Sequence, residues 1–118
     1  MWNIEFYKKD NLEEPVRNFI VNLATKERAK VVQEIENIRS EGIYLGLPFV
    51  KKIAGKKYIG LWELRVRFGS EYIRIIYFLH SKKTFVLLHG FKKKTNRTPK
   101  RELEIAKRRM IEYKNRRR

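Results

Sequence analysis

Two arginines in the middle of the chain are spaced so that they could act on one phosphate group. Residues 61–78 alternate apolar and polar side chains on both sides of Gly69-Ser70. A Gly-X pair suits a two-residue type II′ hairpin loop, because the first position of that turn needs a positive φ. With this loop, Arg65 lies directly opposite Arg74. Like charges at opposed positions destabilise a sheet, so we expect an anion such as phosphate to bind between the two side chains.

Further polar side chains extend this arginine pair into a candidate catalytic site. A turn at Ser81-Lys82 places His89 on the following strand, opposite Arg74. Arg65, Arg74 and His89 would then form one row on an open sheet face, with Lys92 just beyond the last strand. Arginine forks match phosphate oxygens, and lysine supplies a mobile point charge. These four residues are therefore the predicted catalytic residues.

Such a site could cleave RNA without a metal ion. Cationic groups around one phosphodiester would hold it and stabilise the charge of a pentacovalent transition state. The substrate's own 2′-hydroxyl would be the nucleophile, and cleavage would leave a 2′,3′-cyclic phosphate. His89 is a candidate general acid or base because its unperturbed pKa is near neutrality, although it could also be only a cross-strand filler. The arginines could instead pair with Glu63, Glu71 or a carboxylate of the C-terminal helix.

Other basic and aromatic side chains could bind RNA around this site. Lysine and arginine contact phosphates, and aromatic rings stack on unpaired bases. The predicted RNA-binding residues are Lys51, Lys52, Lys56, Lys57, Arg67, Tyr72, Phe91, Lys93 and Lys94. Of these, Phe91 could equally cover the edge of the core. With two histidines and no cysteine, we expect neither a metal site nor a cofactor.

The formal net charge of +16 on 118 residues indicates a polyanionic partner, nucleic acid before a membrane surface. A solvated basic surface without a specific partner is the alternative. The first residues do not combine a basic region with an apolar run, so no signal peptide is expected. No apolar stretch is long enough for a membrane span. A cytoplasmic protein without a membrane partner is the default expectation.

Apolar periodicity predicts a helical hairpin near the N-terminus. The first helix should start between Asp10 and Pro15, because proline and acidic residues are favoured in a first turn. Thr25 can cap the second helix, which should end near Glu41-Gly42. The expected core-facing residues are Val16, Phe19, Ile20 and Leu23 in the first helix and Ala29, Val32, Ile35 and Ile38 in the second.

The remaining elements complete a single α+β domain over residues 1–118. Strands are expected at 2–7, 49–53 and 84–91 beside the long hairpin, and a C-terminal helix should start with Thr98 as N-cap and Pro99 at its first position. That helix should run toward Lys114, with an apolar stripe of Leu103, Ala106, Met110 and Tyr113. The expected core face of the sheet carries Trp62, Leu64, Val66, Phe68, Ile73, Ile75, Tyr77, Leu79, Val86 and Leu88. The predicted order is β-α-α-β-β-β-α, with helices on one face of a mainly antiparallel sheet.

Three segments resemble the RelE/ParE superfamily of type II toxin–antitoxin toxins, in particular its HigB-like, phage-associated branch. They are Leu61-Trp-Glu-Leu-Arg65, Tyr72-Ile-Arg74-Ile-Ile-Tyr77-Phe, and Leu88-His-Gly-Phe-Lys-Lys-Lys-Thr95 leading to Thr98-Pro99. The resemblance implies a small ribonuclease that enters the ribosomal A site and cuts mRNA. It also implies a cognate helix-turn-helix antitoxin (HigA-like). Arg65 and Arg74 fall at phosphate-binding positions of the family, and the acid/base residue falls between His89 and Lys94.

Two other functions remain open at this point. A ParE-like gyrase inhibitor acts by protein binding and needs no arginine constellation. A non-catalytic RNA- or ribosome-binding module would need only the positive charge, whereas catalysis needs convergent groups. The extended basic C-terminal helix departs from the family pattern, and it could cover the site or bind the antitoxin.

Overall fold

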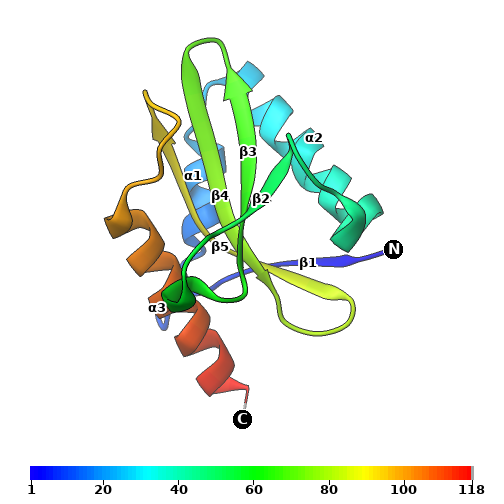
Figure 1. Ribbon diagram of the computed structural model, residues 1–118, viewed down its shortest axis with the longest axis vertical. Coiled ribbons are helices and arrows are strands. Elements are labelled where there is room, and N and C mark those ends of the chain that lie inside the picture. The colour runs from blue at the N-terminus through cyan, green and yellow to red at the C-terminus, as the bar shows by residue number, and fades with distance from the viewer. Residues whose placement is uncertain (118) are drawn as a thin grey trace.

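The computed structural model describes residues 1–117, which form a mixed α+β fold with a five-stranded sheet and three α-helices (Figure 1). The elements in chain order are β1 (Asn3–Phe6), α1 (Pro15–Val21), α2 (Thr25–Glu41), β2 (Val50–Lys52), β3 (Leu61–Phe68), β4 (Glu71–Leu79), β5 (Thr84–Lys93) and α3 (Lys100–Arg116). Short 3-10 turns lie at Gly42–Tyr44 and Lys56–Tyr58. The strand expected at 49–53 is present as β2, so the observed order has one strand more than the predicted β-α-α-β-β-β-α. None of the helices in residues 1–117 is long and apolar enough to cross a membrane.

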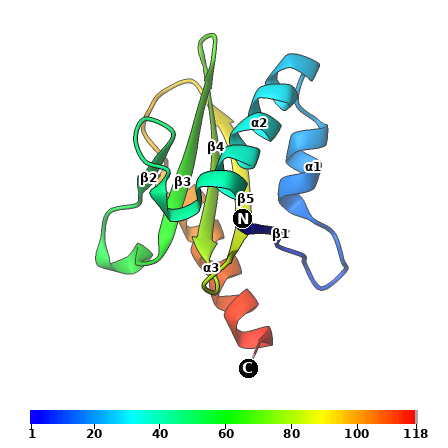
Figure 2. The ribbon, with the colours of Figure 1, turned by 90° about the vertical axis from the view of Figure 1, so that its right-hand side faces the viewer.

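The sheet order is β1-β5-β4-β3-β2, with β1 parallel to β5 and every other pair antiparallel. This agrees with the predicted mainly antiparallel sheet. The helices, however, lie on both faces: α1 and α2 cover one face, and α3 covers part of the other (Figure 2). The prediction that all helices share one face is therefore wrong. The face that carries the arginines is not open along its whole length.

The first core lies between the helical hairpin and the sheet. It contains Leu64, Val66, Ile73, Ile75 and Tyr77, as predicted, together with Phe85 and Leu87 of β5. The buried stripe of α2 consists of Glu27, Val31, Ile35 and Ile38, whereas Ala29 and Val32 are exposed. Steps of four and three residues follow the 3.6-residue period, while the predicted steps of three drift away from one face.

The second core lies between α3 and the other face of the sheet. It contains Ala106, Met110 and Tyr113 of the predicted helical stripe, with Leu103 packed against it. Val86 and Leu88 belong to this core and not to the first, so their predicted face is wrong. At the start of α3, Pro99 occupies the N-cap position and Thr98 precedes it, one residue later than predicted.

The long hairpin has the predicted register, with Arg65 opposite Arg74 and Phe68 opposite Glu71. Gly69 has a φ of +61°, as the first loop position of this turn requires. The next pair of strands differs from the prediction, because Leu79 pairs with Phe85 and a β-bulge interrupts the ladder between Ile76 and Tyr77.

The loop and the bulge each shift β5 by one residue relative to β4. As a result, His89 lies opposite Ile76, and Phe91 takes the position opposite Arg74 that was predicted for His89. The predicted row of Arg65, Arg74 and His89 is therefore wrong. Together the two shifts amount to two residues, which leaves the faces of the residues after the bulge unchanged. Because β5 continues to Lys93, Lys93 shares the face of Arg74 and Lys92 lies with Ile73 on the helical-hairpin face.

Candidate functional site

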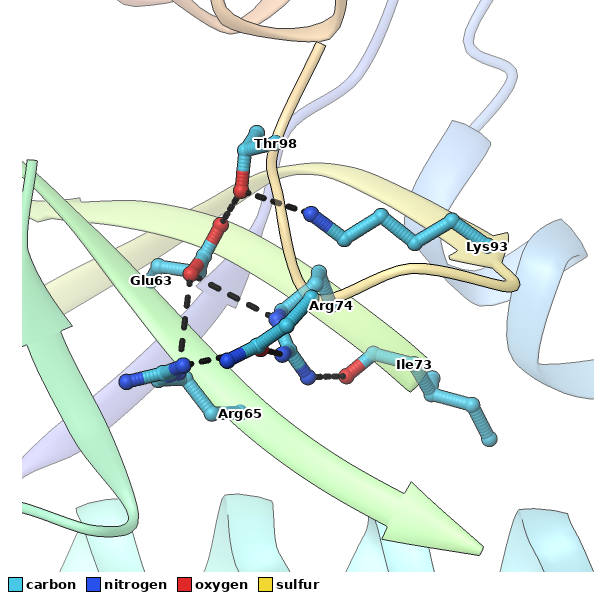
Figure 3. A network of polar contacts seen from close by, with 7 residues as sticks. Glu63, Arg65, Ile73, Arg74, Lys93 and Thr98 are labelled. Carbon is cyan, nitrogen blue, oxygen red and sulfur yellow. Dashed lines mark hydrogen bonds and ion pairs between the residues drawn. The ribbon is translucent and has the colours of Figure 1, made fainter. Parts of the chain in front are cut away.

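Two opposed arginines converge on one oxygen atom beside the start of α3. Arg65 Nη2 donates a hydrogen bond to Asn96 Oδ1 at 2.9 Å, and Arg74 Nη2 donates to the same oxygen. Arg74 Nη1 also donates to the carbonyl oxygen of Ile73 at 3.2 Å (Figure 3). The two guanidinium groups, held by neighbouring strands, thus share a single acceptor.

One buried carboxylate lies beside both arginines. Glu63 Oε1 is 3.4 Å from Arg74 Nε and 3.8 Å from Arg65 Nε (Figure 3). Arg74 is only 2% exposed, and its Nε lacks a hydrogen bond of good geometry among residues 1–117. Burial lowers the pKa of Arg74, which the Glu63 carboxylate opposes and the Arg65 charge reinforces. Burying a charged group in this way is costly unless its hydrogen bonds are satisfied, so the cluster is built around an incompletely satisfied cation.

Lys93 is the third cation of the cluster. Its Nζ donates to Thr98 Oγ1 at 3.0 Å, and the Thr98 hydroxyl in turn donates to Glu63 Oε2 (Figure 3). Burial lowers the pKa of Lys93 to about 8; the Glu63 carboxylate opposes this shift, and the charges of Arg74 and Arg65 add to it. A lysine with a pKa near 8 can both hold a phosphate and exchange a proton close to neutral pH.

His89 lies in a separate polar cluster under α3. Its Nε2 is 2.7 Å from Glu102 Oε1, and Arg109 Nη1 lies 3.3 Å from its Nδ1. Because a guanidinium can only donate, Nδ1 must accept and Nε2 carries the proton. Burial lowers the pKa of His89, opposed by the hydrogen bond to Glu102 and reinforced by the Arg109 charge. Its ring also stacks on Phe91, 5.4 Å between centroids, so both ring nitrogens and one face of this histidine are in contact with other side chains.

Lys92 is separated from the arginines by the thickness of the sheet. Its Nζ pairs with Glu27 Oε2 of α2 at 3.2 Å. This position contradicts its predicted place beside Arg65 and Arg74. The neighbouring Lys94 is exposed and pairs with Glu71 at 2.6 Å.

The predicted RNA-binding residues fall into distinct groups. Lys51 and Lys52 are exposed on β2, and Lys56 and Lys57 are exposed in the following 3-10 turn. Arg67 lies over the ring of Tyr72, 5.0 Å from its centroid, and the Arg74 guanidinium lies 5.2 Å from the same ring. Phe91 is buried in the second core, which makes it a core residue and not an accessible stacking platform.

A cavity of about 310 Å³ opens beside Arg65, between β2 and the start of α3. Its apolar lining comes from Ile53, Ala54 and Leu103, and its polar lining from Lys51, Lys52, Glu63, Arg65, Asn96, Arg97 and Thr98. The cavity therefore joins the arginine pair to the exposed lysines of β2. Within residues 1–117, no three His, Asp or Glu side chains are grouped as metal ligands.

Sequence reasoning missed Asn96 and Thr98 as members of the site. Neither residue belongs to a strand or helix, and a single Asn or Thr in a lysine-rich loop gives no periodic signal. Glu63 was considered only as an alternative partner of the arginines, and the structure shows it in contact with both. Its position two residues before Arg65 on the same strand face was the available clue.

Comparison with known proteins gives one family match. The family model described as Phage derived protein Gp49-like (DUF891) matches residues 18–111, which include α2, the whole β2–β5 region and most of α3. No curated protein matches the chain.

Proposed function

The chain belongs to the Gp49-like family of phage-derived, toxin-like proteins within the RelE/ParE-like toxin superfamily, and on that premise we propose that it is a metal-independent endoribonuclease. Its substrate would be mRNA on the ribosome, and its action would stop translation. We also propose that the chain belongs to the HigB-like branch, that a helix-turn-helix (HigA-like) antitoxin neutralises it, and that it acts in the cytoplasm. These finer assignments are supported by the resemblance of the segments around Arg65, Arg74 and Lys92–Thr95 to that branch.

The observation that carries the proposal is the grouping of three cations around one carboxylate, Glu63. Arg65 and Arg74 lie beside Glu63 and donate from their Nη2 atoms to one shared oxygen, that of Asn96. Lys93 is linked to Glu63 through the hydroxyl of Thr98. A module that only binds RNA needs dispersed positive charge. Convergent donors held by neighbouring strands are what a phosphoryl transition state needs.

In this mechanism the arginines bind the non-bridging oxygens of the scissile phosphate and stabilise the added negative charge. The 2′-hydroxyl oxygen attacks phosphorus, its proton passes to water, and the bond from phosphorus to the 5′-oxygen breaks. Lys93, in its ammonium form, donates a proton to that leaving oxygen. The products are a 2′,3′-cyclic phosphate and a 5′-hydroxyl. Lys93 replaces His89 and Lys92 in this role, because it shares the face of the arginines and has a pKa of about 8.

The exposed lysines would guide the protein to ribosomal RNA. Lys51 and Lys52 line the cavity that leads to Arg65, and Lys56 and Lys57 are exposed in the 3-10 turn that follows β2. Concentrated positive charge speeds the approach of a polyanion and makes binding dependent on salt. This charge also fits the proposal that the substrate is mRNA bound on the ribosome, because the lysines would contact the surrounding ribosomal RNA.

The decisive experiment compares mRNA cleavage by wild type and by variants of the arginine pair. We would induce wild type, Arg65→Ala and Arg74→Lys in a bacterium, and map mRNA 5′ ends together with plasmid supercoiling. Arg101→Ala, an exposed charge change on α3, is the matched control. We expect codon-phased cuts in wild type and control that fall at least tenfold in both arginine variants. Intact mRNA with altered supercoiling would refute the ribonuclease proposal in favour of a gyrase inhibitor.

A further inference from the structure

The acceptor shared by the two arginines comes from an exposed loop. Asn96 belongs to the segment of residues 94–98 that connects β5 to α3, here called the connecting segment. Residues 94–97 are all exposed, including Asn96 itself. Only the amide oxygen of Asn96 reaches inward to Arg65 and Arg74. An exposed residue has thus placed one polar atom between two guanidinium groups of the sheet.

This oxygen lies where a phosphate oxygen would satisfy both arginines. Arginine binds a phosphate through parallel N–H donors, and the Nη2 atoms of Arg65 and Arg74 already share one oxygen. The charge of the cluster is not balanced by residues 1–117, because within them Glu63 is the single carboxylate paired with these two arginines, and it is linked to Lys93 through Thr98. A neutral amide leaves that excess positive charge in place, whereas a phosphate would neutralise it.

We propose that Asn96 closes an anion site in the free protein, and that a phosphate group binds by displacing the Asn96 side chain from Arg65 and Arg74. The connecting segment is then a strap that opens when the anion enters. With RNA as the source of the phosphate, the inference rests on the ribonuclease proposed above. Displacement by a small phosphate does not depend on it.

Few contacts of the connecting segment resist this opening. No apolar side chain of residues 94–98 is buried, since the segment is Lys-Thr-Asn-Arg-Thr. Its first residue makes an exposed ion pair, Lys94 with Glu71, and such pairs contribute little to stability. Thr98 anchors the other end through Glu63 and Lys93. Asn96 can therefore leave the arginines while the helix beyond Thr98 stays in place.

The exchange favours phosphate because of the acceptor's charge. A guanidinium donor makes a charge-assisted hydrogen bond to either acceptor, but a phosphate oxygen adds the attraction between opposite charges that a neutral amide oxygen lacks. The apparent affinity for phosphate equals the affinity of the open site multiplied by the fraction of molecules in which Asn96 has left the arginines. Removing the amide should raise affinity for a small phosphate, and replacing it with a carboxylate should lower it.

The test measures binding of inorganic phosphate to the full chain at low salt, by calorimetry and by NMR of the arginine Nε–H groups. We expect Asn96→Ala to bind phosphate about tenfold more tightly than wild type, a change equivalent to about 1.4 kcal/mol. Asn96→Asp should bind at least tenfold more weakly, because its carboxylate competes as an anion. Thr95→Ala, an exposed change in the same segment, is the matched control and should equal wild type. Arg65→Ala should lose the binding in every background.

Equal or weaker phosphate binding by Asn96→Ala would overturn the proposal, because Asn96 would then be a ligand of the anion and not its competitor. Binding that survives in Arg65→Ala would also overturn it, since the phosphate would occupy another place. These results are separate from the ribonuclease test. If Asn96→Ala binds phosphate more tightly but the wild type cuts no mRNA, the closed anion site stands and the ribonuclease proposal falls.

Discussion

Replacing Glu63 with glutamine should destabilise the fold strongly, because among residues 1–117 Glu63 supplies the one negative charge in contact with the arginine pair. Its Oε1 lies 3.4 Å from Arg74 Nε and 3.8 Å from Arg65 Nε. At an effective dielectric constant of about 20, these separations correspond to about 5 and about 4 kcal/mol of attraction. The residue is 6% exposed, and Arg74 is 2% exposed, so solvent screens the pair weakly. Part of this attraction offsets the cost of burying the charges, and removal of one partner of a buried pair typically costs about 3–5 kcal/mol.

Urea unfolding at pH 7 checks this magnitude. Glu63→Gln keeps the size of the side chain and its ability to accept from Thr98, so the measured loss reports the charge. Glu36→Gln is the matched control, because Glu36 is half-exposed and pairs with Arg39 at 3.0 Å on the surface of α2. Surface pairs on a helix contribute about 0.3–0.5 kcal/mol. If Glu63→Gln and Glu36→Gln lose similar free energy of unfolding, the charge of Glu63 does not stabilise the buried arginines, and the reasoning is refuted.

The same variant should be rescued by an anion. Without Glu63, Arg65, Arg74 and Lys93 have no contacting carboxylate in residues 1–117, and phosphate can take its place. A ligand that binds only the folded state stabilises it by about 2.7 kcal/mol at a hundredfold excess over its Kd. We therefore expect phosphate to recover most of the loss in Glu63→Gln, while chloride at equal ionic strength recovers little. An equal effect of both salts would refute the reasoning.

Two further predictions concern pH. If Lys93 donates the proton to the leaving oxygen, the cleavage rate should fall as pH rises through about 8, the pKa of its buried ammonium group; Lys93→Arg should lower the rate and remove this limb, and an unchanged profile in that variant would assign the limb to another group. For His89, burial lowers the pKa in the folded state, so the folded protein binds a proton less readily than the unfolded chain. Its contribution is present above the unfolded pKa of about 6.5 and lost as pH falls through the folded value. Urea unfolding at pH 7.5 and pH 5 should therefore show a larger acid-induced loss in wild type than in His89→Gln, and equal losses would contradict this account.

The β3–β4 hairpin could be predicted in full because its register depends on local chemistry. Gly69 and Ser70 fix the loop, and apolar alternation on both strands fixes the faces, so the opposition of Arg65 and Arg74 follows. The two helices of the hairpin also follow from periodicity. For α2, the phase of the stripe was wrong because Glu27 is buried, and its carboxylate accepts from the backbone N–H of Ala24 at 3.2 Å.

The β4–β5 register could not be predicted because it depends on two features without a sequence signature. The loop after Leu79 has no Gly-containing turn to fix its length, and the bulge leaves Leu88 without a partner on β4. Each feature shifts the pairing by one residue. The shift of one residue at the loop exchanges faces, which is why Val86 was placed in the wrong core, and the bulge then restores the faces. Lys92 was placed beside the arginines because β5 was expected to end at Phe91, so no register fixed the face of the lysines that follow.

The sequence contains a pattern that indicates that the second face of the sheet is covered. Residues 85–88 of β5 read Phe-Val-Leu-Leu, an unbroken apolar run. Such a run is typical of a strand that is buried on both faces, whereas alternation indicates one exposed face. Combined with the apolar stripe of the C-terminal helix, this run predicts that α3 packs against the sheet opposite α1 and α2.

The connecting segment ties the position of α3 to the state of the arginine site. Asn96 contacts both arginines, and two residues later Thr98 contacts Glu63 and Lys93 before α3 begins. After Thr98, α3 is fixed to the sheet by Ala106, Met110 and Tyr113 and by the hydrogen bond between Glu102 and His89. A docked helix therefore keeps Thr98 in the site, so the short segment before it has room to move Asn96 but little room to move Lys93. The arginines can exchange their acceptor while the proposed proton donor keeps its place.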